Sequence, residues 1–241
     1  MEIFNNNCFD KLKEIEDNSV DCFICDLPYG TTACKWDVKI DLDELWREMK
    51  RTARNDNTPY FFFCDMRLAV ELINSNPKMY RYDIVVNKGN VVGFLNSKRM
   101  PMRKHELLLV FYKKLPTYNV LKYHKKVGGQ TEISEDKRKS IYGKLKTTTN
   151  GFKNAYEPIL PNSIVNMKNL NRRRDKNHPT EKTQDILEWI IKYYTNEGDT
   201  ILDPTMGSGS TGVACKTLNR NFIGIEMDEK YYEVAKKRLN L

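Results

Sequence analysis

Short apolar runs alternate with amphipathic stretches along most of the chain. Continuous apolar runs are typical of buried strands, and apolar residues spaced three and four apart are typical of helices. The runs predict strands at residues 3–4, 20–25, 60–64, 82–86, 107–112, 200–202 and 221–225. The spacing predicts helices at residues 8–15, 41–52, 67–74, 181–194, 210–218 and 229–239. From residue 113 to residue 177 the periodicity fades, and Pro, Asn, Thr and Lys dominate.

Strands that alternate with helices predict an α/β fold. Several strands, such as residues 60–64, are apolar at every position, which indicates a mostly parallel sheet with helices on both faces. The 241 residues suffice for one good-sized domain or two very small ones, and the sequence contains no internal repeat.

The composition excludes several classes of protein. Hydrophobic residues make up 40% of the chain and aromatic residues 11%, which is enough to bury a core and excludes a disordered chain. No apolar run approaches the length of about eighteen residues that a membrane span needs. The first residues carry neither the basic nor the apolar part of a secretory signal. We therefore expect a cytoplasmic protein without a membrane partner.

Cys22 and Cys25 have the spacing of a metal-binding or redox pair. No second such pair and no nearby pair of histidines completes a zinc site. Both cysteines also lie in a run that predicts a strand, where residues three apart point to opposite faces. We expect reduced, buried cysteines and no metal.

The positive charge is concentrated in one part of the chain. The net charge is +8, yet residues 113–176 hold sixteen basic and five acidic side chains, so the rest of the chain sums to −3. Tyrosines are interleaved with the basic residues, which include two runs, Lys137-Arg138-Lys139 and Arg172-Arg173-Arg174. Such a segment is either a solvated loop or a surface that binds the phosphates of a nucleic acid, and the concentration of charge favours the nucleic acid.

A glycine-rich turn follows the strand at residues 200–202 and opens a helix, with Gly207, Gly209 and Gly212 spaced as GxGxxG. This arrangement brings backbone N–H groups and a helix N-terminus to a ligand. Glu226 ends the next strand, where it can accept hydrogen bonds from a ribose diol.

Two classes of cofactor use this geometry. A dinucleotide-binding domain places its glycines at the start of a longer run of strands, but only twenty-nine residues follow Gly212 here. Asp203, at the end of the strand before the glycines, would repel a pyrophosphate and suits a ligand with a cationic end. S-adenosylmethionine, which carries an ammonium and a sulfonium, therefore fits better than NAD.

A second motif, Asp26-Leu27-Pro28-Tyr29, follows the strand at residues 20–25. The exocyclic amino nitrogen of a base is a poor nucleophile because its lone pair is delocalised into the ring. The Asp26 carboxylate and the Leu27 carbonyl can accept its two N–H protons and localise that lone pair. Pro28 stiffens the turn, and Tyr29 offers a flat face on which an extruded base can stack.

The two motifs together resemble those of the amino-methylating DNA methyltransferases, whose catalytic motif is [D/N/S]PP[Y/F/W] and whose cofactor motif is DPFxGSGT. The order of the motifs is similar to the family's beta class, a circular permutation of the common order. Supporting matches are the segments 178–182 and 222–226, together with His105-Glu106. The resemblance covers residues 1–112 and 178–241.

The resemblance implies a Rossmann-like class I methyltransferase fold, a catalytic domain of residues 1–112 and 178–241, and a basic target-recognition insertion at 113–177. It implies S-adenosylmethionine as cofactor and DNA as partner. The concentration of positive charge then predicts the basic runs 137–139 and 172–174 as DNA-binding residues. The implied catalytic residues are Asp26, Leu27, Pro28 and Tyr29. The implied cofactor-binding residues are Asn7, Cys8, Asp26, His178, Lys182, Asp203, Pro204, Thr205, Gly207, Ser208, Gly209, Ser210, Thr211, Glu226 and Met227.

This sequence departs from the family pattern at a few positions. Leu27 replaces the first proline of the catalytic motif, Thr205 and Met206 replace the residues common in the cofactor motif, and Asn7 replaces an Asp. An initial Asp in the catalytic motif resembles the adenine-N6 enzymes, since N4-cytosine enzymes more often carry Ser. We therefore expect methylation of adenine N6 in DNA, with base flipping.

Other functions stay open at this point. N4-cytosine methylation is the nearest alternative, followed by methylation of RNA or of a protein amide. From other classes, a NAD-binding oxidoreductase or a non-catalytic DNA-binding module would also use parts of these motifs. The sequence leaves open whether the chain forms a homodimer and whether a cognate restriction endonuclease acts on the same site.

Overall fold

The computed structural model describes residues 1–28, 39–127, 156–167 and 181–241. They fall into two compact units, residues 1–118 with 163–241 and residues 119–162. Some of the predicted site residues lie outside the described residues: Tyr29, His178, Lys137, Arg138, Lys139, Arg172, Arg173 and Arg174.

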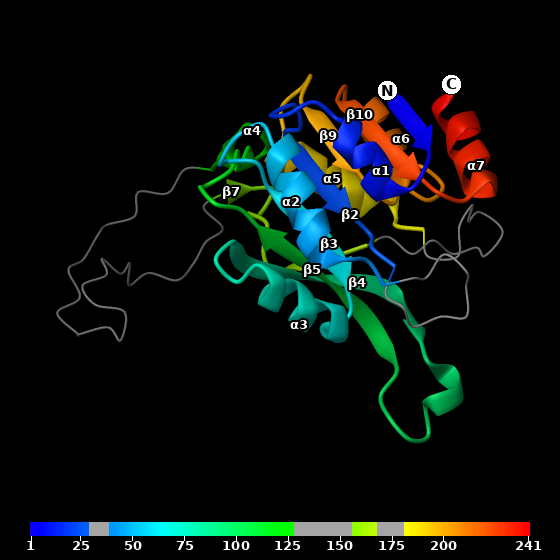
Figure 1. Cartoon of the computed structure of the whole chain (residues 1–241). Coiled ribbons are helices and arrows are strands. Elements are labelled where there is room, and N and C mark those ends of the chain that lie inside the picture. Colours follow the sequence, from blue (N-terminus) through cyan, green and yellow to red (C-terminus); the bar gives the residue numbers. More distant parts are fainter. Residues whose placement is uncertain (29–38, 128–155, 168–180) are drawn as a thin grey trace. The chain divides into compact units, whose positions relative to one another are not determined.

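The larger unit is built on an eight-stranded sheet (Figure 1). In spatial order its strands are β1 (Glu2–Asn5), β10 (Asn221–Glu226), β9 (Thr200–Asp203), β2 (Cys22–Cys25), β3 (Tyr60–Cys64), β5 (Arg103–Phe111), β4 (Tyr80–Val92) and β8 (Ile164–Asn166). Among the described strands of this sheet, β5 alone runs antiparallel to its neighbours. The prediction of a mostly parallel α/β sheet is confirmed.

Helices cover both faces of the sheet. On one side α1 (Cys8–Glu14) packs on α2 (Leu42–Thr52), which packs on α3 (Met66–Ser75). On the other side α6 (Ser210–Thr217) packs between α5 (Gln184–Tyr194) and α7 (Glu229–Leu239) (Figure 1).

Strand β3 is buried at every position, which explains why its sequence has no polar face. Side chains alternate between the two faces of a strand. The ring of Phe62 lies 5.2 Å from Trp46 of α2, whereas the ring of Phe61 lies 4.9 Å from Tyr194 of α5. Both faces are therefore buried under helices, as the continuous apolar run predicted.

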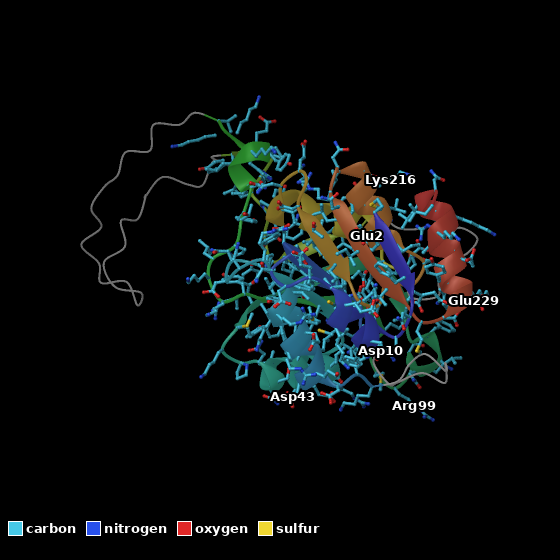
Figure 2. The ribbon with its side chains drawn as sticks, turned by 45° about the horizontal axis from the view of Figure 1, so that its top comes forward. Glu2, Asp10, Asp43, Arg99, Lys216 and Glu229 are labelled. Carbon is cyan, nitrogen blue, oxygen red and sulfur yellow. The ribbon has the colours of Figure 1, made fainter. Side chains whose placement is uncertain are left out.

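Strands β4 and β5 extend well beyond the predicted runs 82–86 and 107–112. Past the pairing of Asn87 with His105 they form a hairpin that includes the short 3₁₀ helix η1 (Phe94–Asn96). Phe94 and Leu95 in this hairpin are 78% and 97% exposed. The apolar pattern did not predict this part because its apolar side chains are exposed and not part of the core. Figure 2 labels Arg99 in the hairpin, among the charged side chains on the outer surface.

One strand of the sheet comes from within the insertion predicted at residues 113–177. Strand β8 pairs in parallel with β4, Val85 opposite Ile164 and Asn87 opposite Asn166. The smaller unit, residues 119–162, contains α4 (Val120–Tyr123) and the paired strands β6 (Lys125–Lys126) and β7 (Tyr156–Glu157). The compact units divide after residues 118 and 162, and the predicted boundaries of the insertion were residues 113 and 177.

Five cysteines lie in the described residues, and all of them are free thiols. Cys22 and Cys25 are fully buried, as expected from their strand. Across the ranges that the structure describes, no helix combines the length and the apolar character needed to cross a bilayer.

Candidate active site

The two sequence motifs meet at the carboxyl edge of the sheet. Strands β2 and β9 are parallel neighbours, with Cys22 opposite Ile201. Asp26 follows β2 and Asp203 ends β9, so both carboxylates lie at the same edge. The Thr205 hydroxyl donates a hydrogen bond of 3.1 Å to the Asp26 carbonyl and ties the two turns together. In open α/β sheets this edge is where ligands bind.

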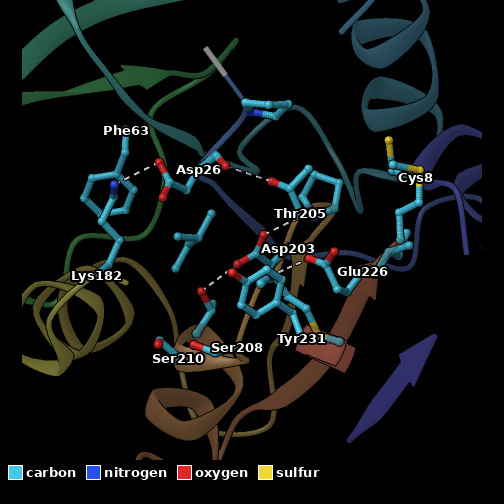
Figure 3. A pocket seen from close by; sticks show the side chains of 18 of the residues that line it. Cys8, Asp26, Phe63, Lys182, Asp203, Thr205, Ser208, Ser210, Glu226 and Tyr231 are labelled. Carbon is cyan, nitrogen blue, oxygen red and sulfur yellow. Dashed lines mark hydrogen bonds and ion pairs between the residues drawn. The ribbon is translucent and has the colours of Figure 1, made fainter. Parts of the chain in front are cut away.

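A cavity of about 380 Å³ lies at this edge, within the size range of small-molecule sites (Figure 3). Of the residues proposed from sequence for catalysis or cofactor binding, the following line it: Asn7, Cys8, Asp26, Pro28, Lys182, Asp203, Pro204, Thr205, Gly207, Ser208, Ser210, Thr211, Glu226 and Met227. Leu27 and Gly209 do not.

The glycine-rich turn holds its shape because its glycines adopt backbone conformations that other residues rarely adopt. Gly207 has φ of 54° and Gly209 has φ of 76°. A Cβ at Gly209 would lie 2.9 Å from the Cβ of Ala235 in α7. The absence of a side chain at Gly209 therefore allows α7 to pack closely against the turn. Gly207 lines the cavity.

Asp203 lies beneath the cavity and is 4% exposed. Its carboxylate accepts hydrogen bonds of 2.7 Å from the Thr211 hydroxyl and 3.1 Å from the Thr205 N–H. Burial, with the nearby Asp26 and Glu226 carboxylates, raises the pKa of Asp203 to about 7. A cation bound in the cavity would favour the ionised form.

Glu226 ends β10 and faces the same cavity. Its two carboxylate oxygens accept hydrogen bonds from the backbone N–H groups of Gly207, at 2.9 Å, and Asp228, at 2.8 Å. These bonds fix the carboxylate, and burial raises its pKa. Each oxygen keeps a further acceptor position, so Glu226 can also bind hydroxyl groups of a ligand.

Asn7 and Cys8 line the cavity at the start of α1. The Asn7 side chain accepts a hydrogen bond of 2.9 Å from the Phe9 N–H and thereby caps the helix. Burial raises the pKa of the Cys8 thiol to about 11, so this thiol is neutral near pH 7.

Ser208 and Ser210 of the glycine-rich turn are hydrogen-bonded to side chains of other elements. Arg238 of α7 donates hydrogen bonds to the Ser208 hydroxyl, at 2.9 Å, and to the Ser210 hydroxyl, at 3.2 Å. Glu181 lies 2.8 Å from Arg238 and accepts a bond of 2.9 Å from Ser210. This network joins the N-terminal ends of α5 and α6 to the last turn of α7.

The residues of the catalytic motif divide into two groups. Asp26 and Pro28 line the cavity, whereas the Leu27 side chain is 2% exposed and belongs to the hydrophobic core. The side chain at position 27 therefore packs in the core and not in the cavity. The Asp26 carboxylate lies 2.8 Å from the Lys182 ammonium (Figure 3).

Several cavity residues were not predicted. Phe63 lies near the end of β3, the strand that pairs with β2. Glu181 belongs to the segment 178–182 that resembles the family motif. Tyr231 comes from the first turn of α7. No local pattern marks Tyr231, because its place at the cavity depends on how α7 packs.

Several known proteins are similar to this chain in sequence or in fold. Residues 20–237 match a family model described as DNA methylase. The type II methyltransferase M.HpaI of Haemophilus parainfluenzae is 28% identical over 252 residues, which cover 98% of this chain and 73% of that protein. The crystal structure of the M1.HpyAVI–SAM complex superposes with a TM-score of 0.68 and 26% identity, covering 100% of this chain and 99% of that one. The cytosine-N4-specific PvuII DNA methyltransferase has a TM-score of 0.69 at 13% identity, covering 98% and 85%, a likeness of fold alone.

Proposed function

This chain belongs to the DNA methylase family, whose model matches residues 20–237, and on that premise we propose that it methylates the N6 amino group of adenine in DNA with S-adenosylmethionine as the methyl donor. DNA methyl transfer is the family's activity. The choice of adenine and the roles of the individual residues are the proposal.

The observation that carries the proposal is the shared cavity of Asp26, Asp203 and Glu226. Asp26 begins a catalytic motif that fits an amino group, and the other two carboxylates suit a ligand with a cationic end and a ribose. An Asp at position 26, where the N4-cytosine enzymes more often have Ser, favours adenine.

The residues present fit S-adenosylmethionine. Glu226 is fixed by two backbone N–H groups at the cavity, where it would accept hydrogen bonds from the ribose hydroxyls. Asp203, when ionised, would supply a negative charge to the cationic groups of the cofactor, and Met227 and Asn7 line the same cavity. When bound, S-adenosylmethionine supplies a methyl group activated by a positively charged sulfur.

The chain's own residues act on the target base. The Asp26 carboxylate and the Leu27 carbonyl accept the two N–H groups of adenine N6, which localises the nitrogen lone pair. The negative charge of Asp26 stabilises the positive charge that develops on this nitrogen, and Asp26 accepts the proton that the nitrogen loses. Tyr29 stacks on the flipped base.

DNA reaches this edge of the sheet from the side on which the β4–β5 hairpin projects. Because β4 is parallel to β2 and β3, its carboxyl end leaves the sheet at the edge that holds Asp26. The hairpin carries Lys98, Arg99 and Lys104, which suit phosphates. The basic runs 137–139 and 172–174 belong to the proposed target-recognition segment.

The test is methylation of unmethylated genomic DNA with labelled S-adenosylmethionine, followed by digestion to nucleosides and mass spectrometry. We expect N6-methyladenine. Asp26→Ala should abolish it and leave cofactor affinity nearly intact, whereas Asp41→Ala, a helix cap outside the cavity, should keep activity. N4-methylcytosine alone would overturn the choice of adenine, and Asp26→Ala activity within tenfold of the parent would overturn the role of Asp26.

A further inference from the structure

A chain of four alternating charges runs from the proposed catalytic carboxylate toward the β4–β5 hairpin. The Lys182 ammonium lies 2.8 Å from Asp26 Oδ1 and 3.5 Å from Glu106 Oε2. The same oxygen of Glu106 lies 2.9 Å from the ammonium of Lys88. The charges therefore alternate from Asp26 to Lys88.

These residues come from segments far apart in the sequence. Asp26 follows β2, Glu106 lies in β5, Lys88 lies in β4, and Lys182 precedes α5. Three of the four side chains are largely covered, with exposures of 22% for Asp26, 12% for Lys182 and 11% for Glu106. The Lys182 ammonium also lies 4.9 Å from the centre of the Phe63 ring, in a cation–π contact (Figure 3).

These contacts argue against Lys182 as a cofactor ligand, the role that the resemblance implied. Its ammonium already has two carboxylate partners and an aromatic face. S-adenosylmethionine carries positive charge at its reactive end, and a second cation beside it would repel it. The partners of Lys182 instead include the carboxylate proposed to receive the target amino group.

We propose that Lys182 is a positioning residue for methyl transfer, which fixes the Asp26 carboxylate and keeps it ionised, and that Glu106 in turn fixes Lys182. This inference rests on the proposed function, because it takes Asp26 as the group that binds the target amine. It replaces a role in cofactor binding by a role in preparing the catalytic carboxylate.

The electrostatics give each residue a distinct effect. Burial raises the pKa of Asp26, and Glu106 adds to this, whereas Lys182 and more weakly Lys88 lower it. Among the other groups near Asp26, Asp203 is also an acid, and the Cys64 thiol, with its pKa raised to about 12, stays neutral. Removing Lys182 should therefore raise the pKa of Asp26, and removing the charge of Glu106 should lower it.

The experiment compares Lys182→Met, Lys182→Arg and Glu106→Gln. Three quantities are measured: methyl transfer against pH, cofactor affinity by calorimetry, and the Asp26 carboxyl titration by NMR of protein labelled with carbon-13 at the aspartate carboxyls, assigned with Asp26→Asn. Lys11→Met is the matched control, because the Lys11 ammonium also lies 2.8 Å from a carboxylate, that of Glu14, and over an aromatic ring, that of Phe4, but outside the cavity. Thermal melting checks that every variant folds.

For Lys182→Met we expect kcat to fall by about a hundredfold or more and the cofactor dissociation constant to stay within threefold. The Asp26 titration and the acid limb of the pH profile should move up by about one to three units. Glu106→Gln should move both down, and Lys182→Arg should restore most activity, because it keeps the charge. Lys11→Met should change none of these quantities.

Two results would overturn the inference. One is a loss of cofactor affinity in Lys182→Met as large as its loss of kcat, which would make Lys182 a cofactor ligand. The other is an Asp26 titration that does not move in Lys182→Met. Both leave the proposed function standing, whereas a parent protein that transfers no methyl group to DNA would overturn that function itself.

Discussion

Met206 of the glycine-rich turn packs directly over Gly224 in the neighbouring strand β10. A Cβ at Gly224 would fall far inside van der Waals contact with Met206 Sδ, and it would lie 2.5 Å from Cε1 of Phe222. Met206 is 5% exposed, so it fills the space that the glycine leaves. The backbone of the turn is also joined to this strand, because the Met206 N–H donates a hydrogen bond of 3.0 Å to the Ile225 carbonyl.

Gly224→Ala should therefore destabilise the protein by about 1–3 kcal/mol, the usual cost of overpacking a core. Chemical denaturation measures this free energy of unfolding. The double variant Gly224→Ala with Met206→Ala should recover part of the loss, because the shorter side chain makes room for the added methyl group. Strictly additive losses in the two single variants would show that Met206 and Gly224 do not share this space.

Glu226→Ala should weaken cofactor binding by about ten- to a hundredfold, because the ribose diol loses a charge-assisted hydrogen bond worth about 1.5–3 kcal/mol. Calorimetry with S-adenosylmethionine measures the affinity. The matched control is Asp228→Ala, which removes the cap of α7 two residues away but no proposed cofactor contact. An unchanged affinity in Glu226→Ala would remove this residue from the binding site.

Cofactor affinity should increase as pH rises through about 7. Without cofactor Asp203 has a pKa of about 7 and is protonated below it, whereas a bound cation favours the carboxylate, so binding below pH 7 releases a proton. Calorimetry in two buffers of different ionisation enthalpy counts this proton. Asp203→Asn should bind more weakly and lose the part of the pH dependence that Asp203 causes.

The same pKa shift predicts how the stability of the cofactor-free protein depends on pH. The pKa of Asp203 is higher in the folded state than its ordinary value of 3.8, so the folded state binds a proton that the unfolded state has lost. This contribution is complete below about pH 4 and disappears as pH rises to about 7. Asp203→Asn should flatten the profile of unfolding free energy between about pH 4 and pH 7. If the profiles of the variant and the parent have the same slope there, the raised pKa of Asp203 is contradicted.

Tyr29 should be replaceable by Phe but not by Ala. Stacking on a flipped base needs an aromatic face and no hydroxyl, and it is worth about 1–3 kcal/mol per base. Methyl transfer at subsaturating DNA measures the effect. Equal loss of activity in Tyr29→Phe and Tyr29→Ala would mean that the hydroxyl matters.

Replacing Arg172, Arg173 and Arg174 together by Gln should weaken binding to all DNA sequences alike. If these side chains bind phosphates, the slope of log affinity against log salt should flatten by about 0.9 for each phosphate that is no longer neutralised. Fluorescence anisotropy with specific and non-specific duplexes at several salt concentrations measures both. A weakening confined to the specific duplex would indicate that the arginines bind bases instead, at about 1–3 kcal/mol each.

Much of the fold follows from local sequence pattern. The prediction of strand 60–64 and helix 229–239 matches β3 and α7 to the residue. The elements that the pattern missed or cut short depend on contacts between distant parts of the chain. For example, β8 is three residues long and forms a strand because it pairs with β4. The outer half of the β4–β5 hairpin is exposed, and its two strands are joined by backbone pairing. Because its side chains are not buried in the core, their apolar positions do not alternate in a way that predicts a strand.

By itself the sequence determined which residues stand at the ends of the strands, because the length of an apolar run and the polar residue that ends it are local properties. It thereby identified Asp26, Asp203 and Glu226. Only the tertiary structure decided which charges face one another there. Lys182 pairs with Asp26 and Glu106, which lie 156 and 76 positions away in the sequence. Such a pairing depends on the order of the strands and the packing of α5, which no local pattern of residues specifies.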